Sequence, residues 1–327
     1  MIRYKTMLHA TQLNQPTTTS LKSIRHLIPR SSKHWVGDGF HVRPAFNSLA
    51  FTKHISPFLM LDYALEDFEP NANAKKRKGV GQHPHRGFET VTIAYQGEIE
   101  HADSLGHRDV IKTGDVQWMT AGAGIVHEEF HGIDWARTGG TVEMVQLWVN
   151  LPAKHKMTPA TYQALSSESM PPVALLRSGA DSETETETDT ESVGTLRVIA
   201  GNYGATKGPG TTFSDLNVWD IELTVPGGNI QLDVPETHNT MLLVRKGEVE
   251  IVDEKGKKTL VNSEQVVLFE MKSGSNAIQI VSKTLPSSVL LLSGVPFDEP
   301  IANMGPFVMN TQEELRQAQV DYRSGKF

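Results

Sequence analysis

The sequence contains no cysteine among its 327 residues. This absence excludes disulfide bonds, zinc sites built on thiolates and catalysis by a cysteine nucleophile. A chain without disulfides is typical of a reducing compartment, so we expect a cytoplasmic protein. The first residues also lack the apolar core of a secretory signal peptide.

Long apolar runs and an excess of basic residues are missing as well. No apolar segment approaches the roughly 18 to 20 residues of a membrane-spanning helix, so we expect no membrane partner. The formal net charge is −7 at pH 7. Binding to nucleic acid through phosphate contacts requires a basic face, and we therefore expect no direct nucleic-acid partner.

Acidic residues are absent from the first 37 positions, where arginine and lysine recur, and Asp38 is the first acid. Such a composition resembles a transit peptide. We favour a simpler interpretation, a flexible N-terminal arm over residues 1–20, because this stretch is polar and rich in threonine.

The remainder of the chain is dominated by strand signals. In FETVTIAY (88–95), apolar residues alternate with threonine and alanine, which is the period of a half-buried strand. No stretch between His85 and His127 has helical periodicity. A length of 327 residues suits two domains of about 150 residues. We predict an all-β protein built from small barrels or double-sheet jelly rolls, which close their sheet edges and leave an interior for a ligand.

The two halves of the chain resemble each other. MLLVRKGEVEIVD (241–253) repeats the pattern of VTIAYQGEIEHAD (91–103): an apolar strand, a turn that ends in glycine, and then Glu-apolar-Glu. This similarity predicts an internal duplication of one β unit. The second copy has His238 alone where the first copy has a pair of histidines, so we expect a metal site only in the first copy.

These signals define five segments. Helix formers in ATYQALSSE (160–168) predict a short helix. Acid alternates with serine or threonine in DSETETETDTES (181–192), which predicts a disordered surface insertion. Thr311, followed by Glu314, is a capping-box signature for a C-terminal helix. The predicted segments are a flexible arm (1–20), a first β domain with a metal site (21–152), a linker with the acidic insertion (153–194), a second, degenerate β domain (195–309) and a helical tail (310–327).

Two short motifs predict a metal site. HPH supplies His83 and His85, and HEE supplies His127 and Glu129, each pair two residues apart. In a strand, residues at this spacing point to the same face. Pro84 favours extended backbone. Two neighbouring strands would therefore bring three imidazoles and one carboxylate together, a nitrogen and oxygen ligand set for a transition metal.

Other polar residues near these motifs have alternative interpretations. Glu128 is expected to point away from the site, because it alternates with its two neighbours. Glu89 is interpreted as a structural residue or one that supports the ligands from behind. Arg86 either orients a ligand or closes a turn, and the sequence leaves both open. The other histidines of this region are interpreted as loop or core residues: His101, His107 and His131.

Four segments resemble the pirin family of bicupins: HPHRGFET, GDVQWMTAGAGIVHEEF, QLWVNLP and GPFVMNTQEELRQAQVDYRSGKF. The resemblance covers nearly the whole chain apart from the first twenty residues and the acidic insertion. It implies two cupin (jelly-roll β-barrel) domains packed face to face and a short C-terminal helix. It also implies one divalent transition metal, most often Fe(II), held only in the first domain by His83, His85, His127 and Glu129.

The ligand set predicts the chemistry. Three neutral imidazoles and one carboxylate leave a divalent metal with positive charge and open positions, at which a flavonol could bind through its 3-hydroxyl and 4-carbonyl oxygens. Glu129 is the expected catalytic residue, because it can accept the released hydroxyl proton. Mn, Co, Ni, Cu and Zn accept similar ligands, so the ligand types leave the metal open.

The resemblance implies two functions of different classes. Some bacterial members of the family are quercetin 2,3-dioxygenases, which cleave the central ring of the flavonol with O₂ and release carbon monoxide. Animal members are nuclear regulators. We predict a monomeric dioxygenase acting on an aromatic or enolisable small molecule and O₂. The alternative is a non-enzymatic regulator whose metal state alters a surface that binds a partner protein. An open apolar pocket would favour the enzyme, and a sealed metal would favour the regulator.

Overall fold

The computed structural model describes residues 20–71, 73, 76–178 and 191–327. The predicted flexible arm and acidic insertion lie outside these residues, except for Ser20, Glu191 and Ser192. Among the described residues, no helix combines the length and apolar character needed to cross a membrane.

The first barrel consists of two antiparallel sheets. Strand order is β12-β9-β6-β11-β4-β3-β2 in the larger sheet and β5-β10-β7-β8 in the smaller one. Its strands are β2 (His34–Val36), β3 (Phe40–Asn47), β4 (Phe58–Phe68), β5 (Gly79–His85), β6 (Phe88–Gln96), β7 (Ile99–Asp103), β8 (Arg108–Ile111), β9 (Val116–Thr120), β10 (Ile125–His131), β11 (Gly140–Asn150) and β12 (Thr161–Leu165).

The second barrel repeats this arrangement. Its sheets have the orders β1-β22-β19-β24-β17-β14-β13 and β18-β23-β20-β21, so each strand corresponds to one in the first barrel. The predicted duplication is therefore confirmed. The strands are β1 (Ile24–Ile28), β13 (Val173–Leu176), β14 (Ser192–Ala200), β17 (Leu216–Leu223), β18 (Asn229–Asp233), β19 (Asn239–Lys246), β20 (Glu248–Val252), β21 (Lys258–Asn262), β22 (Val266–Phe269), β23 (Ala277–Ser282) and β24 (Ser287–Gly294).

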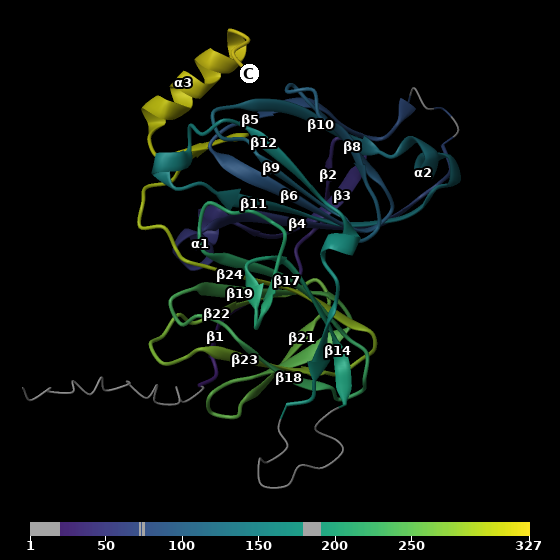
Figure 1. The fold of residues 1–327 in the computed structure, drawn as a ribbon, viewed down its shortest axis with the longest axis vertical. Helices are drawn as coiled ribbons and strands as arrows, with labels where there is room; N and C mark the ends of the chain where they lie inside the picture. Colours follow the sequence, from purple (N-terminus) through teal and green to yellow (C-terminus); the bar gives the residue numbers. More distant parts are fainter. Residues whose placement is uncertain (1–19, 72, 74–75, 179–190) are drawn as a thin grey trace, which may run out of the picture.

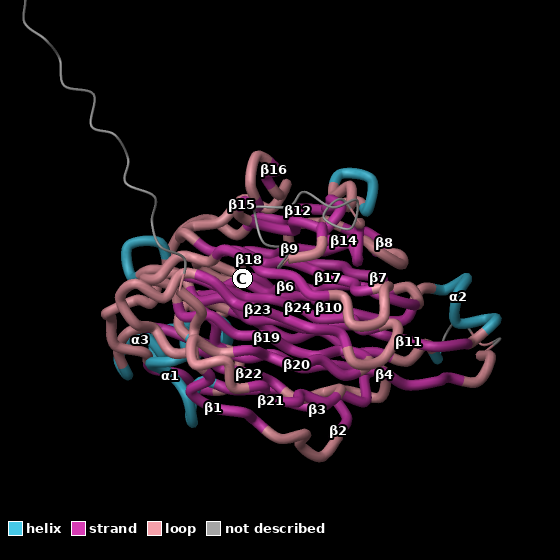
Figure 2. Tube along the Cα trace, turned by 90° about the horizontal axis from the view of Figure 1, so that it is seen from below, coloured by secondary structure: helices cyan, strands magenta, loops and turns pink. Residues whose placement is uncertain are grey.

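Few elements lie outside the barrels. Strands β15 (Asn202–Tyr203) and β16 (Thr206–Lys207) form one small hairpin, and β25 (Ala302–Met304) and β26 (Phe307–Met309) form another. The helices are α1 (Ser48–Ile55), α2 (Ile133–Thr138) and α3 (Gln312–Arg323), with short 3₁₀ turns η2 (Ala153–His155) and η3 (Ser167–Ser169). Figure 2 shows strands through the middle of the molecule and the three α-helices at its periphery.

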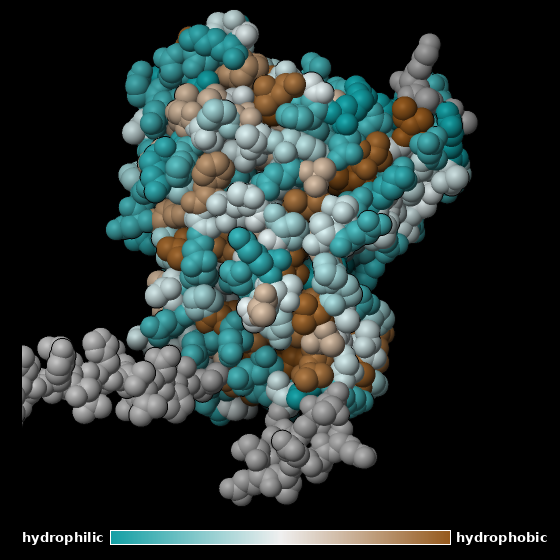
Figure 3. Space-filling view, in the orientation of Figure 1, coloured by the Kyte–Doolittle hydropathy of each residue, from teal (hydrophilic) through white to brown (hydrophobic). Residues whose placement is uncertain are grey.

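The barrels pack face to face through their larger sheets, as predicted (Figure 1). One continuous core cluster joins Val91, Trp118 and Leu147 of the first barrel to Met241 and Leu290 of the second. Burial of this apolar surface is the main force that holds the barrels together. On the outer face shown in Figure 3, hydrophilic residues are interspersed with smaller hydrophobic groups over both barrels.

Strand β1 differs from the predicted domain division. Residues 24–28 fall within the segment assigned to the first domain, but β1 pairs with β22 and completes the second barrel. Only its two end residues, Ile24 and Ile28, are partly buried, and the three between them are exposed. Such a short edge strand carries little information about its partner, which lies about 240 residues further along the chain.

The predicted linker is also more ordered than expected. The prediction of a helix in 160–168 is wrong, because Thr161–Leu165 forms β12 and pairs with β9. Pairing with an existing sheet edge outweighs the weak helix preference of these residues. Later in the same segment, β13 pairs with β14 of the second barrel. The linker thus supplies one edge strand to each barrel.

The C-terminal segment returns to the first barrel. Helix α3 begins at the predicted capping box, in which Thr311 and Glu314 each accept a hydrogen bond from the other's backbone. The short C-terminal helix is therefore confirmed. The buried Lys156 ammonium holds this segment against the first barrel. It donates to Val308 O of the segment at 2.9 Å, and to Gly87 O and Asn150 Oδ1 of the barrel at 2.8 Å each.

Candidate metal centre

Strands β5 and β10 position the candidate ligands. They pair antiparallel, and His127 lies directly opposite His83 in the register. His85 follows two residues after His83 and therefore points to the same side. A β-bulge interrupts the register beyond this point, since Glu129 lies opposite Val80. Bulges of this kind reorient side chains and are frequent next to functional sites.

Three of the four predicted ligands lie close together. The ligand atoms of His83, His85 and His127 all lie within 4.8 Å of one another. The distances between ring centroids are 4.2 Å for His83–His127, 4.9 Å for His83–His85 and 5.0 Å for His85–His127. Among the described residues, no comparable group of metal-ligating side chains occurs in the second barrel.

In each of the three rings, Nδ1 has a hydrogen-bond partner. This partner determines which ring nitrogen carries the proton and which has a free lone pair. His83 Nδ1 donates to Gly81 O at 2.9 Å, and His85 Nδ1 donates to Pro306 O at 3.4 Å. A neutral imidazole that donates from Nδ1 carries its lone pair on Nε2. His127 Nε2 is buried and has no hydrogen-bond partner in the described protein. Three histidines this close together, each with one ring nitrogen free of the hydrogen bonds described, fit a divalent transition metal.

A chain of hydrogen bonds sets the tautomer of His127. The Asp103 carboxylate lies 3.2 Å from His101 Nε2 and accepts its proton, which leaves His101 Nδ1 as an acceptor. His127 Nδ1 lies 3.4 Å from His101 Nδ1 and is therefore the donor of that pair. Gln117 Nε2, at 3.2 Å, is a second donor to the same acceptor atom. The chain thus leaves His127 Nε2 unprotonated and available to a metal.

Burial keeps two of the three histidines, His85 and His127, neutral. It lowers the pKa of His85 to about 3, with a smaller contribution from neighbouring His83, and it holds the pKa of His127 well below its usual range. The Asp103 side chain is fully buried, which by itself would raise its pKa. Hydrogen bonds from His101 and His107 outweigh burial, and the pKa of Asp103 is lowered. His85 and His127 are therefore neutral at pH 7, and the Asp103 carboxylate that accepts from His101 is ionised.

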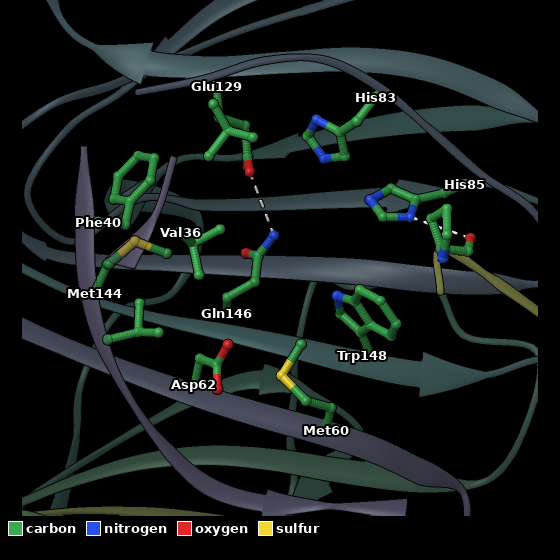
Figure 4. Close-up of a pocket in the computed structure, with 13 residues that line it drawn as sticks. Val36, Phe40, Met60, Asp62, His83, His85, Glu129, Met144, Gln146 and Trp148 are labelled. Carbon is green, nitrogen blue, oxygen red and sulfur yellow. Dashed lines mark hydrogen bonds between the residues drawn. The ribbon is translucent and has the colours of Figure 1, made fainter. Parts of the chain in front are cut away.

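Glu129, the fourth predicted ligand, does not belong to the close histidine group. Its carboxylate faces the same cavity (Figure 4), where Oε1 lies 3.2 Å from Thr92 Oγ1 and 3.4 Å from Gln117 Nε2. Gln146 Nε2 is 3.4 Å from Oε2. These contacts are long, so the carboxylate is held loosely beside the histidines. It can act as a proton acceptor, or as an additional ligand if its side chain turns toward the histidines.

A largely apolar cavity of about 390 Å³ adjoins the histidines. His83, His85 and Glu129 contribute to its wall, and His83 is partly exposed. Its size is within the range of pockets that enclose small organic ligands. The other lining residues are Val36, Phe40, Val42, Met60, Asp62, Val80, Met144, Gln146, Trp148 and Pro306.

The contacts of Arg86 match neither of the two interpretations that the sequence left open. Its guanidinium donates to Ala123 O at 2.6 Å and to Asp321 Oδ2 at 2.9 Å. It also lies over the ring of Phe327, with 4.6 Å from Cζ to the ring centroid. Arg86 follows directly after His85, the last residue of β5, and it therefore anchors the C-terminal tail on the barrel next to this candidate ligand.

Glu89 faces away from the histidines. It shares a face of β6 with Val91, which belongs to the core cluster between the barrels, whereas Thr92 on the opposite face contacts Glu129. Its side chain is buried and accepts a hydrogen bond from Thr120 Oγ1 at 2.8 Å. The structural interpretation of Glu89 is therefore the one that fits its position.

Burial raises the pKa of Glu89 to about 7, from an ordinary value of 4.5. The folded state then binds more protons than the unfolded state between these values, so the stability contributed by this group is complete below pH 4.5 and is lost as pH rises through 7. Between pH 5 and pH 8, we expect E89Q to gain about 2.5 kcal/mol of unfolding free energy relative to wild type. Urea unfolding of both proteins at the two pH values measures this difference, and parallel pH profiles would contradict it.

The remaining candidates occupy different positions. His131 is buried among aromatic rings and donates to Gly39 O at 2.8 Å, so it is a core residue, as interpreted. His238 is buried in the second barrel beside Ser293. His101, by contrast, is not a simple core histidine, because it contacts His127. The sequence signal for this role is His101-x-Asp103 on β7, the strand paired with β10.

We expect D103N to weaken the binding of a divalent metal by about 10- to 100-fold, because outer partners of ligating histidines usually contribute this much. An asparagine can donate to His101 Nε2, which would reverse the tautomers of His101 and His127. Competition with a chelator for Zn²⁺ measures the affinity. H107Q is the matched control. It removes the other imidazole bound to Asp103 but keeps the hydrogen bonds that link Asp103 through His101 to His127. Equal affinities of D103N and wild type would contradict the assignment.

Two jelly-roll barrels, with a histidine cluster in the first and none described in the second, define a bicupin with one metal centre. The chain belongs to the pirin family. The Pirin family model matches residues 39–149, and the model of the Pirin C-terminal cupin domain matches residues 218–327. The predicted family and fold are thus confirmed, and family and histidine cluster together indicate a divalent metal.

Relatives extend over nearly the full length of the chain. A Pseudomonas aeruginosa protein named "Putative quercetin 2,3-dioxygenase PA2418" is 46% identical over 308 residues, covering 94% of this chain and 99% of the relative. A tomato (Solanum lycopersicum) "Pirin-like protein" is 36% identical over 290 residues, covering 89% and 88%. A crystal structure titled as quercetin 2,3-dioxygenase from Acinetobacter baumannii has 44% identity and a TM-score of 0.84, covering 94% and 99%.

Proposed function

We propose that the protein is a metal-dependent dioxygenase that cleaves the central ring of quercetin-like flavonols. In this reaction both atoms of O₂ enter the ring-opened product and one ring carbon leaves as carbon monoxide. The observation that carries the proposal is the group of three histidines, two of which, His83 and His85, line an apolar cavity of about 390 Å³. The names of the bacterial relatives support the same activity.

The residues of the site have two separate roles, metal binding and proton transfer. His83, His85 and His127 would hold a divalent metal, which we propose to be Fe(II). A bound metal supplies Lewis acidity that lowers the pKa of a flavonol hydroxyl, together with redox chemistry toward O₂. Glu129 accepts the hydroxyl proton, since its carboxylate faces the cavity beside the histidines. Its contacts with Thr92 and the two glutamines keep it in place.

The apolar wall serves binding and water exclusion. Trp148 packs edge-on against His85, with 5.3 Å between ring centroids, and contributes an aromatic surface beside the ligand cluster. Met60, Met144 and Phe40 line the same cavity. Flat aromatic rings bind well against such side chains, which also exclude water that would compete for the metal.

The alternative is a pirin-type regulator that binds a partner protein according to its metal state. A metal sealed from ligands would favour that role. Here the cavity reaches the histidines, so the observations favour the enzyme. The cytoplasmic location and the monomeric state expected from the sequence stay predictions.

The test is anaerobic incubation of metal-loaded protein with quercetin, followed by O₂ and measurement of carbon monoxide and ring-opened product. We expect one carbon monoxide per quercetin consumed. E129Q is expected to keep its metal affinity within about tenfold, because three imidazole ligands remain, and to lose about 10²- to 10⁴-fold in rate, the usual contribution of a general base. Metal-loaded protein that releases no carbon monoxide would support the regulator instead.

A further inference from the structure

A row of polar side chains crosses the larger sheet of the first barrel, on the face that is turned toward the cavity. Gln117, Thr92, Gln146 and Asp62 lie side by side on β9, β6, β11 and β4, because the sheet register pairs each with the next. Residues in register on adjacent strands point to the same side of the sheet. Gln146 and Asp62 both line the cavity, as Figure 4 shows.

Gln117, Thr92 and Gln146, the first three members of the row, form hydrogen bonds within the row or with Glu129. Thr92 Oγ1 donates to Gln146 Oε1 at 2.6 Å, and all three lie within 3.4 Å of a Glu129 oxygen. Asp62 is different. Among the residues that the structure describes, its carboxylate makes no hydrogen bond and no ion pair, although it is only partly exposed.

A carboxylate that faces a largely apolar cavity and has no donor from the described protein is free to accept a hydrogen bond from a ligand in that cavity. Burial raises the pKa of Asp62 to about 6, and the charge of His34 opposes this shift only weakly. At neutral pH the group is therefore mainly a carboxylate, which accepts hydrogen bonds but cannot donate one. A hydrogen-bond donor on a ligand would satisfy the Asp62 carboxylate.

The position of Asp62 defines where that donor must be. In Figure 4, Asp62 lies across the cavity from His83 and His85, with Gln146 between. Adjacent strands are about 4.8 Å apart, so Asp62 is one strand spacing beyond Gln146 and about 10 Å from Thr92. A ligand held at the histidines by one end would reach Asp62 with its other end.

We propose that Asp62 is a specificity-determining residue that binds a phenolic hydroxyl at the end of the substrate remote from the metal. The proposal rests on the proposed function and narrows its substrate class. The preferred substrate has an oxygen pair for the metal at one end and a hydrogen-bond donor at the other. An aromatic carboxylic acid with its carboxylate at the remote end is rejected, since two carboxylates would meet in a poorly solvated site.

The test compares two ligands on zinc-loaded protein, in which binding is followed by quenching of tryptophan fluorescence. Quercetin carries hydroxyls on all its ring systems, whereas 3-hydroxyflavone carries only the hydroxyl beside the carbonyl. We expect wild type to prefer quercetin. D62A is expected to lose about 10- to 100-fold in affinity for quercetin, as is typical of hydrogen bonds to charged groups, and less than about threefold for 3-hydroxyflavone.

Two further variants serve as controls. D62N keeps the shape and one acceptor oxygen without the charge, so its quercetin affinity should lie between those of wild type and D62A. D67N, at an exposed position on the same strand, should bind both ligands as wild type does. Unfolding curves report whether each variant is folded.

The outcomes separate this proposal from the proposed function. An equal loss for both ligands in D62A, or a wild type without preference, would overturn the role of Asp62 even if wild type releases carbon monoxide from quercetin. Selectivity that depends on Asp62 without release of carbon monoxide would support the binding role and contradict the dioxygenase. Failure of wild type to bind either flavonol would overturn both.

Discussion

Replacement of His127 by alanine is expected to lower the affinity for a divalent metal at least about 100-fold. The estimate follows from typical binding free energies of 10 to 16 kcal/mol for four protein ligands, or about 3 kcal/mol for each. His127 Nε2 is buried without a partner, and a ring nitrogen of His127 lies within 4.8 Å of those of His83 and His85. Removal of this nitrogen leaves two imidazoles, which are too few for a stable site.

Metal analysis of the purified variant after dialysis against a weak chelator measures the effect. H238A is the matched control, because His238 is equally buried but lies in the second barrel, beside Ser293. H238A should keep its metal. Stoichiometric metal in H127A, or loss of metal from H238A, would show that the ion is bound elsewhere.

Replacement of Arg245 by methionine is expected to cost about 3 kcal/mol of unfolding free energy. Arg245 is buried on β19 of the second barrel, and it lies 2.5 Å from Glu143 of the first barrel and 3.1 Å from Asp220. Burial alone would raise the pKa of Glu143, but Arg245 and Lys246 outweigh it and hold the pKa below its usual value. Without Arg245, a buried carboxylate at the interface loses one of its two cationic partners and keeps only Lys246, which is partly exposed.

A double-mutant cycle tests this assignment. The variant E143L/R245M should lose less stability than the sum of the single losses, because the removal of both charges leaves no unpaired buried ion. Urea unfolding of the four proteins gives the coupling energy. Additive losses would mean that the pair does not interact across the interface.

Local patterns account for what the sequence predicted correctly. Alternation within a strand is fixed over two residues, so HPH and HEE sufficed to place three imidazoles on one side of two strands. The glycine-ended turns and the repeated Glu-apolar-Glu pattern similarly revealed the duplicated barrel. The capping box at Thr311 is equally local, and the helix begins where it predicts.

Features that depend on distant contacts were not predictable from the sequence. Glu129 contacts Thr92, Gln117 and Gln146, which come from the opposite sheet, and no local pattern shows that its carboxylate stays outside the close histidine group. Strand β1 finds its partner in the other barrel. Asp62 lies in an apolar strand, and only the cross-strand register places it in the cavity.

Crystallography of the metal-loaded protein, with an anomalous difference map recorded at the absorption edge of the metal, tests the central claim most directly. We expect one peak, about 2.0 to 2.2 Å from Nε2 of His83, His85 and His127, and none near His238. A peak at any other place, or a metal more than one ångström beyond bonding distance of these nitrogens, would contradict the account.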